Sequence, residues 1–410
     1  MNRKAVSAKT PAGQRGVAMV FVTIGMLAIL GMAGLALDLG HAYVNKTRLQ
    51  NALDAAAISG AKTLDQFPGQ LDLAEADAKN TFRITAAGAG NAELDAGVGN
   101  AGITVQFYAT LIPLTAPANP GNTDARYVRV SVSSFDKPMF LARILPGVDD
   151  TMTVGGSAVA GPSPQIAAPC NLVPIMLCAI DPDDAPADES ASTVYGYNAG
   201  QEYRLTVAPG ENSDVGSGNF RLLSMGGPGA NVLRQNLAGG YGGCVDAETM
   251  TEVETEPGVN EGPVAQGLNT RLGKYQGAGV NPADYPPDTN TCTYGAAHYP
   301  YSNYIADPEC TGSQDTAGGA ERMPERRILA IPIADCSGND SGRSTLPLAG
   351  FACMFMTREV AQGGPPATRG VYGEMLNRGC LASGVPGEDP GAGPGPHTIQ
   401  LYQDPLSDEA

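Results

Sequence analysis

The chain has 410 residues, 53 of them glycine and 32 proline, and a formal net charge of −17. Residues 1–15 carry four basic residues and no acid, so they contribute +4 and the remainder carries −21. An acidic body repels phosphate groups, which excludes nucleic acid as an expected partner. Charged residues make up only 16% of the chain, so its composition predicts a folded, turn-rich protein instead of a disordered one.

The first predicted element is a membrane helix at residues 16–37. The run Val17–Leu37 has no charged residue, and 21 residues at about 1.5 Å each span about 30 Å, the apolar thickness of a bilayer. The basic residues precede the run, so the N-terminus is expected in the cytoplasm and the body outside. A signal peptide cut near residues 34–36 is an alternative, but its apolar core is usually only about 7–15 residues long. A buried soluble helix is a second alternative, although such helices are rarely apolar on all sides.

An amphipathic helix is predicted to continue from Asp38 to about Leu64. Apolar and small residues recur at spacings of three and four, which is the period of one helix face. This face either packs on the chain's own domain, the interpretation that spacing alone favours, or packs on a neighbouring subunit. The residues predicted for such an assembly face are Leu39, Leu49, Leu53, Ala56 and Gly60.

A small sheet is predicted to follow the long helix. After a shorter helix at 75–85, strand-like patterns occur at 103–111, 127–133 and 151–159, and a glycine pair in the last suggests a β-bulge. A long helix followed by a small sheet is the outline of a pilin-like α+β domain, a comparison of shape only. The turn-rich residues 161–164 are the predicted boundary of this domain.

The region after this boundary contains every cysteine. An even number of cysteines beyond a membrane segment predicts disulfides in an oxidising compartment; eight cysteines allow 105 pairings, which the sequence leaves open. Strands are expected at 172–178, 203–207 and 328–333, and a flexible segment at 384–395. The region therefore reads as mostly β, loop-rich and cross-linked. The disulfide candidates are Cys170, Cys178, Cys244, Cys292, Cys310, Cys336, Cys353 and Cys380.

Several short motifs suggest chemistry but fail on spacing. His298 and Ser341 are too close in sequence for a trypsin-like fold, and residues 267–274 lack the spacing and the hydroxyl of a phosphate loop. The acidic residues of 181–189 lack the glycine of a calcium loop, and the Asp335–Asn339 segment has too little chain after it for a metal-binding von Willebrand A domain. We therefore predict no catalytic residue, no cofactor, no metal site and no enzymatic activity.

The N-terminal segment carries a distinctive series of residues. Gly16 precedes the apolar run, an Asp-x-Gly occupies 38–40 at its outer end, and Leu-Gln-x-Ala-x-Asp-Ala-Ala-Ala occupies 49–57. This series resembles the N-terminal domain of TadG-like proteins of the Flp/Tad (tight adherence) pilus-assembly family. The resemblance covers residues 15–62 and is looser through about 165. It implies Gly16 as a prepilin cleavage position, although the glutamate that often follows in relatives is missing here.

The resemblance and the residues together imply a non-enzymatic, membrane-anchored component of pilus assembly, either a minor pilin-like subunit or an envelope assembly factor. Its expected partners are the lipid bilayer and, through the N-terminal helix, other pilus subunits or assembly proteins. Its expected location is the bacterial inner membrane, crossed once, with the C-terminal domain in the periplasm or on a surface pilus. The alternative function is a membrane-tethered periplasmic or surface binding protein, such as an adhesin.

The predicted fold class is α+β: a long transmembrane and amphipathic helix with a small pilin-like domain, then a mostly β, disulfide-containing domain. Its predicted parts are a basic cytoplasmic tail (1–15), the transmembrane helix (16–37), the Tad-like helix with its small α+β domain (38–165), and the Gly/Pro-rich, cysteine-containing extracytoplasmic domain (166–410).

Overall fold

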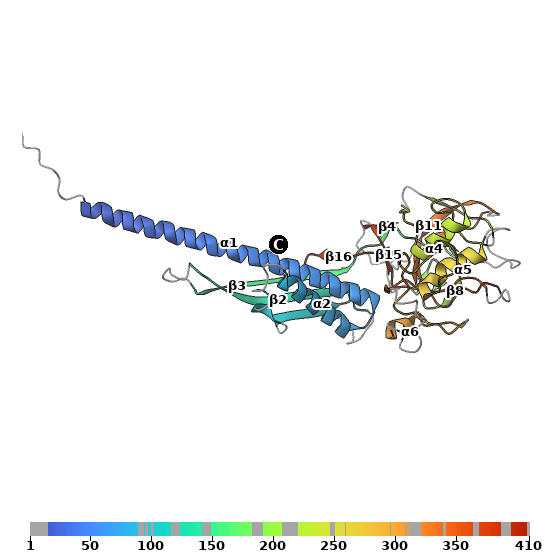
Figure 1. Ribbon diagram of the computed structural model, residues 1–410, viewed down its shortest axis with the longest axis horizontal. Coiled ribbons are helices and arrows are strands. Elements are labelled where there is room, and N and C mark those ends of the chain that lie inside the picture. The colour runs from blue at the N-terminus through green and yellow to red at the C-terminus, as the bar shows by residue number, and fades with distance from the viewer. Residues whose placement is uncertain are drawn as a thin grey trace, which may run out of the picture.

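One continuous helix, α1 (Arg15–Gln66), forms the axis of the computed structural model (Figure 1). Its 52 residues correspond to a length of about 78 Å. The predicted membrane helix and the predicted amphipathic helix are therefore one unbroken element. A turn at Gly69, in the left-handed region at φ 83°, leads into the second helix, α2 (Leu71–Ala87), which packs beside α1. This helix extends beyond both ends of the predicted 75–85.

The structure describes residues 15–88, 94, 97–99, 102–115, 124–141, 149–182, 192–206, 220–246, 251–258, 260–295, 297–307, 310, 321–338, 342–363, 369–386 and 395–407. Residues 1–14 of the predicted basic tail and residues 183–189 of the acidic cluster lie outside these ranges.

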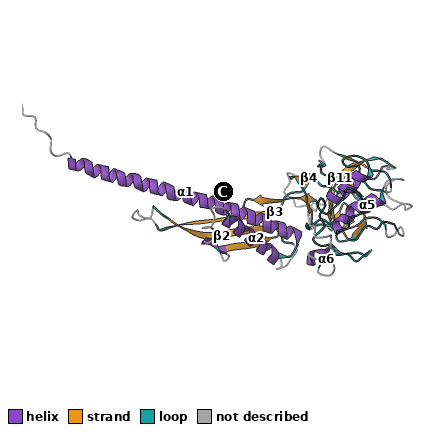
Figure 2. Cartoon of the chain, viewed as in Figure 1, coloured by secondary structure: helices purple, strands orange, loops and turns teal. Residues whose placement is uncertain are grey.

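Both helices cover one face of an antiparallel sheet in the order β1-β2-β3-β16 (Figure 2). The predicted bulge falls at the expected place in the ladder, but the extra residue is in β2, between Val132 and Phe135, opposite the glycine pair. Gly155 makes room for it, because a Cβ there would lie 2.8 Å from the carbonyl oxygen of Ser133. The four strands are β1 (Ile103–Tyr108), β2 (Tyr127–Pro138), β3 (Thr151–Pro162) and β16 (Ile399–Tyr402).

The core between these helices and the sheet is built from small and branched side chains. Leu53 and Ala57 of α1 are buried, as are Val128 and Val130 of β2 that complete the same cluster. Gly60 allows close approach of the helices, because a Cβ there would lie 3.1 Å from that of Ala78 in α2. We call α1 from Asp38, α2 and this sheet the N-terminal domain; it confirms the predicted α+β fold.

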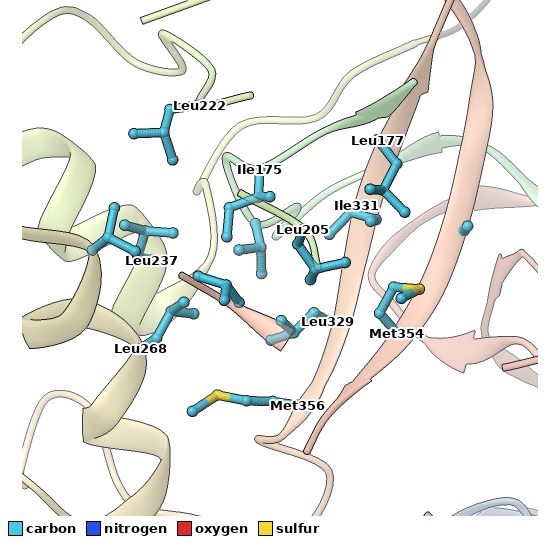
Figure 3. Close-up of a cluster of buried hydrophobic side chains, with 14 of the residues drawn as sticks. Ile175, Leu177, Leu205, Leu222, Leu237, Leu268, Leu329, Ile331, Met354 and Met356 are labelled. Atoms are coloured by element: carbon cyan, nitrogen blue, oxygen red, sulfur yellow. The ribbon is translucent and has the colours of Figure 1, made fainter. Parts of the chain in front are cut away.

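The remaining described residues form a C-terminal domain at the end of the molecule opposite the N-terminus of α1 (Figure 1). Its main sheet has the order β5-β10-β11-β12-β8, and β9 pairs with β11. The central strands β10 and β11 contribute Leu329, Ile331, Met354 and Met356 to the core shown in Figure 3. The strands are β5 (Leu177–Cys178), β8 (Glu202–Arg204), β9 (Glu252–Glu254), β10 (Ile328–Ala334), β11 (Thr345–Met356) and β12 (Tyr372–Met375).

Helices and short ladders complete this domain. The helices α4 (Ala230–Gly239) and α5 (Glu261–Leu268) place Leu237 and Leu268 against the core, and α6 (Tyr301–Ala306) lies nearer the N-terminal domain (Figure 1). The remaining short strands are β4 (Ile166–Pro169) with β14 (Gly384–Pro386), β6 (Thr193–Val194) with β7 (Tyr197–Asn198), and β13 (Cys380–Leu381) with β15 (Pro396–His397).

Some predicted strands differ from the observed ones. Within 172–178 only Leu177–Cys178 forms a strand, because Pro174 has no N–H and the chain turns there, with the Ile175 N–H donating to the Val173 carbonyl. The strand predicted at 203–207 is Glu202–Arg204, and Val207 lies outside the described residues. The strand predicted at 103–111 is β1, which ends three residues earlier, at Tyr108.

The predicted flexible segment 384–395 is wrong at its start. Gly384–Pro386 forms β14, which pairs with β4 in an antiparallel ladder, and a Cβ on Gly384 would lie 2.4 Å from the Ala168 carbonyl oxygen. The glycine that suggested flexibility is therefore needed for close strand contact. Residues 387–394 lie outside the described ranges.

The last strand returns to the N-terminal domain. After leaving along β3 and β4, the chain comes back through β15, and β16 adds an edge strand to β3. Asp404 fixes this end, because it accepts hydrogen bonds from Arg129 Nε at 2.8 Å and from the Ser157 hydroxyl. Residues 399–402 are thus part of the first sheet, and Asp404 holds the chain beside it.

All eight cysteines form disulfides with one another, as predicted, and the structure supplies the pairing that the sequence left open. The pairs are Cys170–Cys244, Cys178–Cys336, Cys292–Cys310 and Cys353–Cys380. The second pair joins β5 to the loop after β10 and closes the longest loop, with a sequence separation of 158.

The lengths of the closed loops predict unequal contributions to stability. Loop-closure entropy makes the Cys178–Cys336 bond about 2 kcal/mol more stabilising than Cys292–Cys310, whose separation is 18. We expect C178A/C336A to lower the free energy of unfolding more than C292A/C310A, measured by guanidinium denaturation of the full chain in detergent. Equal losses, or a larger loss for the short loop, would contradict this expectation.

Candidate functional site

Over residues 18–30, α1 is an apolar surface that no element of the described part of the chain covers. Large side chains such as Met19, Phe21, Leu27 and Leu30 are mostly exposed, on all sides of the helix. Among the described residues, α1 is the one helix long and apolar enough to cross a membrane. Water is a poor solvent for such a surface, at a cost of about 25 cal/mol per Å². This half of the helix therefore requires lipid or another protein around it.

The second half of α1 has the opposite environment. Leu49, Leu53, Ala56 and Gly60, four of the five residues predicted to form an assembly face, are buried against α2 and the sheet of the same chain. They cannot contact a neighbouring subunit while the N-terminal domain is folded, so the prediction of an assembly face at these four positions is wrong. The three-and-four spacing reflects packing on the chain's own domain, the other interpretation that the pattern allowed.

The fifth residue, Leu39, is 46% exposed and belongs to a different surface. With Leu35, Tyr43 and Val44 it forms the outer face of α1, which begins at the end of the apolar run and continues beyond it. Tyr43 is 74% exposed and is the most accessible of the four. Residues 35, 39 and 43 share one side of the helix because they are four positions apart. Sequence reasoning missed Tyr43, although this spacing was visible, and it also missed Val44, which lies off this spacing.

Gly16, the predicted cleavage position, lies in the first turn of α1. Cleavage there stays a prediction.

The far end of α1 meets the C-terminal domain through buried charged groups. Asp65 Oδ2 lies 3.2 Å from His397 Nε2, and Asp65 Oδ1 lies 3.6 Å from Arg378 Nη2. Arg378 also donates to the Leu64 carbonyl oxygen at 2.9 Å. His397 belongs to β15 and Arg378 lies between β12 and β13, so two parts of the C-terminal domain hold one end of the helix.

We call Asp65, Arg126, Glu325, Arg378 and His397 the junction cluster. Burial raises the pKa of Asp65, but His397, Arg378 and Arg126 outweigh this effect and hold that pKa well below its ordinary value. Burial, followed by the charges of Asp65 and Asp288, raises the pKa of Glu325 to about 8. One carboxyl of the cluster is therefore ionised at neutral pH while the other keeps its proton.

The other residues singled out in the sequence are dispersed. His298 Nε2 lies 3.0 Å from Glu374 Oε2, while Ser341 lies outside the described residues. Residues 267–274 include the end of α5 and a short 3₁₀ helix. In the segment that begins at Asp335, Cys336 forms a disulfide with Cys178. Within the described part of the chain, no three His, Cys, Asp or Glu side chains gather where they could hold a metal ion.

Comparison with known proteins gives one match. Residues 16–63 match the family model described as putative Flp pilus-assembly TadE/G-like. The matched segment is most of α1, including the exposed half, the outer face and most of the buried half. No curated protein and no solved structure matches the chain.

The raised pKa of Glu325 predicts a pH dependence of stability. Unfolded, this carboxyl ionises near 4.5; folded, it keeps its proton up to about 8. The folded state therefore binds more protons between these pH values, and its stability falls by up to about 1.4 kcal/mol per pH unit as pH rises. Glu325→Gln keeps an uncharged group beside Gln66 and should remove this pH dependence. The free energy of unfolding of this variant should therefore rise relative to that of the wild type as pH rises.

The measurement is the midpoint of guanidinium unfolding of both proteins at several values between pH 5 and pH 8. If the difference in unfolding midpoint between wild type and Glu325→Gln stays constant over this range, Glu325 has an ordinary pKa and the prediction is wrong. Asp136→Asn, a change of an exposed carboxyl of β2 whose hydrogen-bond partner is Thr153, is the control.

Proposed function

Because the N-terminal helix carries a TadE/G-like Flp pilus-assembly segment, we propose that this protein is a non-enzymatic, membrane-anchored component of that assembly. The exposed half of α1 crosses the inner membrane once, with the N-terminus in the cytoplasm. The N-terminal and C-terminal domains then lie on the periplasmic side. The observation that carries the proposal is the change of environment within α1, from uncovered apolar surface to domain core, with no break in the helix.

The continuity of α1 supports a role in assembly beyond simple tethering. A flexible linker would let the folded domains move independently of the membrane, whereas a helix fixed in a domain core transmits its position and orientation. The outer face of α1 (Leu35, Leu39, Tyr43 and Val44) begins at the end of the membrane segment, and its residues Leu39, Tyr43 and Val44 are available to another pilus subunit or assembly protein just above the bilayer. We assign partner contact to this face in place of the buried residues.

A second candidate function, a membrane-tethered binding protein or adhesin, is favoured by the position of the C-terminal domain. This domain holds all four disulfides and lies at the end of the molecule farthest from the membrane segment (Figure 1). In that case the C-terminal domain would bind a ligand and the outer face of α1 would be dispensable.

Cell fractionation tests the anchor. With a C-terminal tag, we expect full-length protein in the inner-membrane fraction, because the apolar segment is intact and uncovered. A size decrease that depends on the prepilin peptidase, with protein in sheared surface fibres, would identify a processed subunit cut at Gly16. Soluble full-length periplasmic protein would contradict the membrane anchor.

Substitution of the outer face separates the two candidate functions. Both side chains are exposed, so Tyr43→Ser with Val44→Ser should leave the fold intact and cause at least about a tenfold loss of surface pili, corresponding to about 1.4 kcal/mol of lost contact energy. Pili are counted by electron microscopy, and protein level by blotting.

Two control variants make the result specific. Ile58→Ser changes a partly exposed residue of the same helix outside the outer face and should leave piliation normal. Ala56→Arg places a charge in the domain core and should reduce the amount of folded protein itself. Normal piliation in the Tyr43/Val44 variant would favour the tethered binding protein.

A further inference from the structure

The loop between β2 and β3 brings two exposed apolar side chains to the membrane end of the N-terminal domain. Phe140 is 51% exposed and Leu141 is 43% exposed, and both lie within three residues of the end of β2. The Met139 N–H donates to the Asp150 carbonyl oxygen at 2.8 Å, which closes the base of the loop. We call Phe140 and Leu141 the hairpin tip.

Asp38 fastens the hairpin tip to α1. Its carboxylate accepts the backbone N–H of Phe140 at 3.2 Å and that of Leu141 at 2.9 Å, and Asp38 itself is only 7% exposed. Two bonds from N–H groups to one carboxylate are charge-assisted and directional. Asp38 is the first charged residue after the apolar run, so the attachment lies at the end of the proposed membrane segment.

Two further contacts fix the position of the hairpin tip along the axis of α1. A Cβ on Gly34 would lie 3.0 Å from the Cβ of Leu141, so the missing side chain lets the loop rest on the helix. The ring of Phe140 lies 5.8 Å from that of His41. Gly34 is three residues before Leu37, the last residue of the apolar run, which places Leu141 about 4.5 Å to the membrane side of it.

From this geometry, and resting on the proposed membrane anchor, we infer that the hairpin tip is embedded in the interfacial layer of the bilayer that α1 crosses. Phe140 occupies the headgroup level, where aromatic rings accumulate, and Leu141 contacts the upper part of the acyl chains. Asp149 and Asp150 are exposed at the base of the loop. Their carboxylates stay in water and limit the depth of insertion.

The bilayer is the partner that fits because the tip continues the uncovered apolar surface of α1. Asp38 holds the tip at the level where that surface ends, so any lipid that surrounds Gly34 also reaches Leu141. The embedded tip gives the protein a second contact with the membrane, which fixes the rotation of α1 about its own axis. A helix alone, with apolar residues on all sides, has no such preference.

Tryptophan fluorescence provides a direct test, because the chain contains no tryptophan. Full-length Phe140→Trp is reconstituted in phosphatidylcholine vesicles that contain lipids brominated either near the headgroup or near the chain ends. We expect strong quenching by the first lipid and little by the second. Tyr294→Trp, at an exposed position of the C-terminal domain, should be quenched by neither.

Leu27→Trp separates the inference from the anchor on which it rests. If the fluorescence of Leu27→Trp is quenched and that of Phe140→Trp is not, the embedded tip is overturned and the anchor is kept. The same outcome is expected if the tip contacts another protein instead of lipid. Unquenched Leu27→Trp overturns the anchor itself.

Asp38→Ala tests the attachment. Combined with Phe140→Trp it should weaken quenching at least about twofold, because the two bonds to a charged acceptor are lost. Combined with Leu27→Trp it should leave quenching unchanged. Undiminished quenching of Phe140→Trp without Asp38 would overturn the role assigned to this carboxylate.

Discussion

The structure depends on one helix that must satisfy two environments. The first half of α1 exposes apolar side chains on every side, while the second half contributes Leu49, Leu53 and Leu64 to the core of the N-terminal domain. Because no turn separates the halves, the position of the domain follows from the position of the apolar segment. The sheet, the short helix α2 and the hairpin tip are all placed by contact with this element.

The end of α1 shows how the same constraint reaches the C-terminal domain. Apolar packing alone would allow the two domains to slide or rotate, whereas charge pairs and hydrogen bonds fix direction. Asp65 is held by His397 and Arg378, and each contact loses strength if the domains shift by a few ångströms. Burying these groups has a cost, which the protonated state of Glu325 reduces because it removes one negative charge from the cluster.

The sequence predicted what depends on local pattern. The uncharged run and the three-and-four spacing predicted α1, and the cysteine distribution predicted disulfides beyond it. The stripe containing Leu53 and Ala56 could not identify its partner, because a helix face looks the same whether its own sheet or a neighbour covers it. Disulfide pairing, the strand Ile399–Tyr402 and the contact of Asp65 with His397, 332 positions away, depend on distant parts of the chain. The exception is the outer face, where the spacing of Leu35, Leu39 and Tyr43 was readable.

The return of β16 to the first sheet has a mechanical consequence. The C-terminal domain is joined to the N-terminal domain by two covalent connections, one leaving β3 and one entering β16, and these strands are direct neighbours. A pull on the distal domain therefore loads both strands together, along their length, and does not peel one from the other. Rupture would require the pair to slide past β2 as a unit, breaking many hydrogen bonds at once. Such a connection suits the membrane-anchored role proposed above, because force on the distal domain is carried by two strands instead of one.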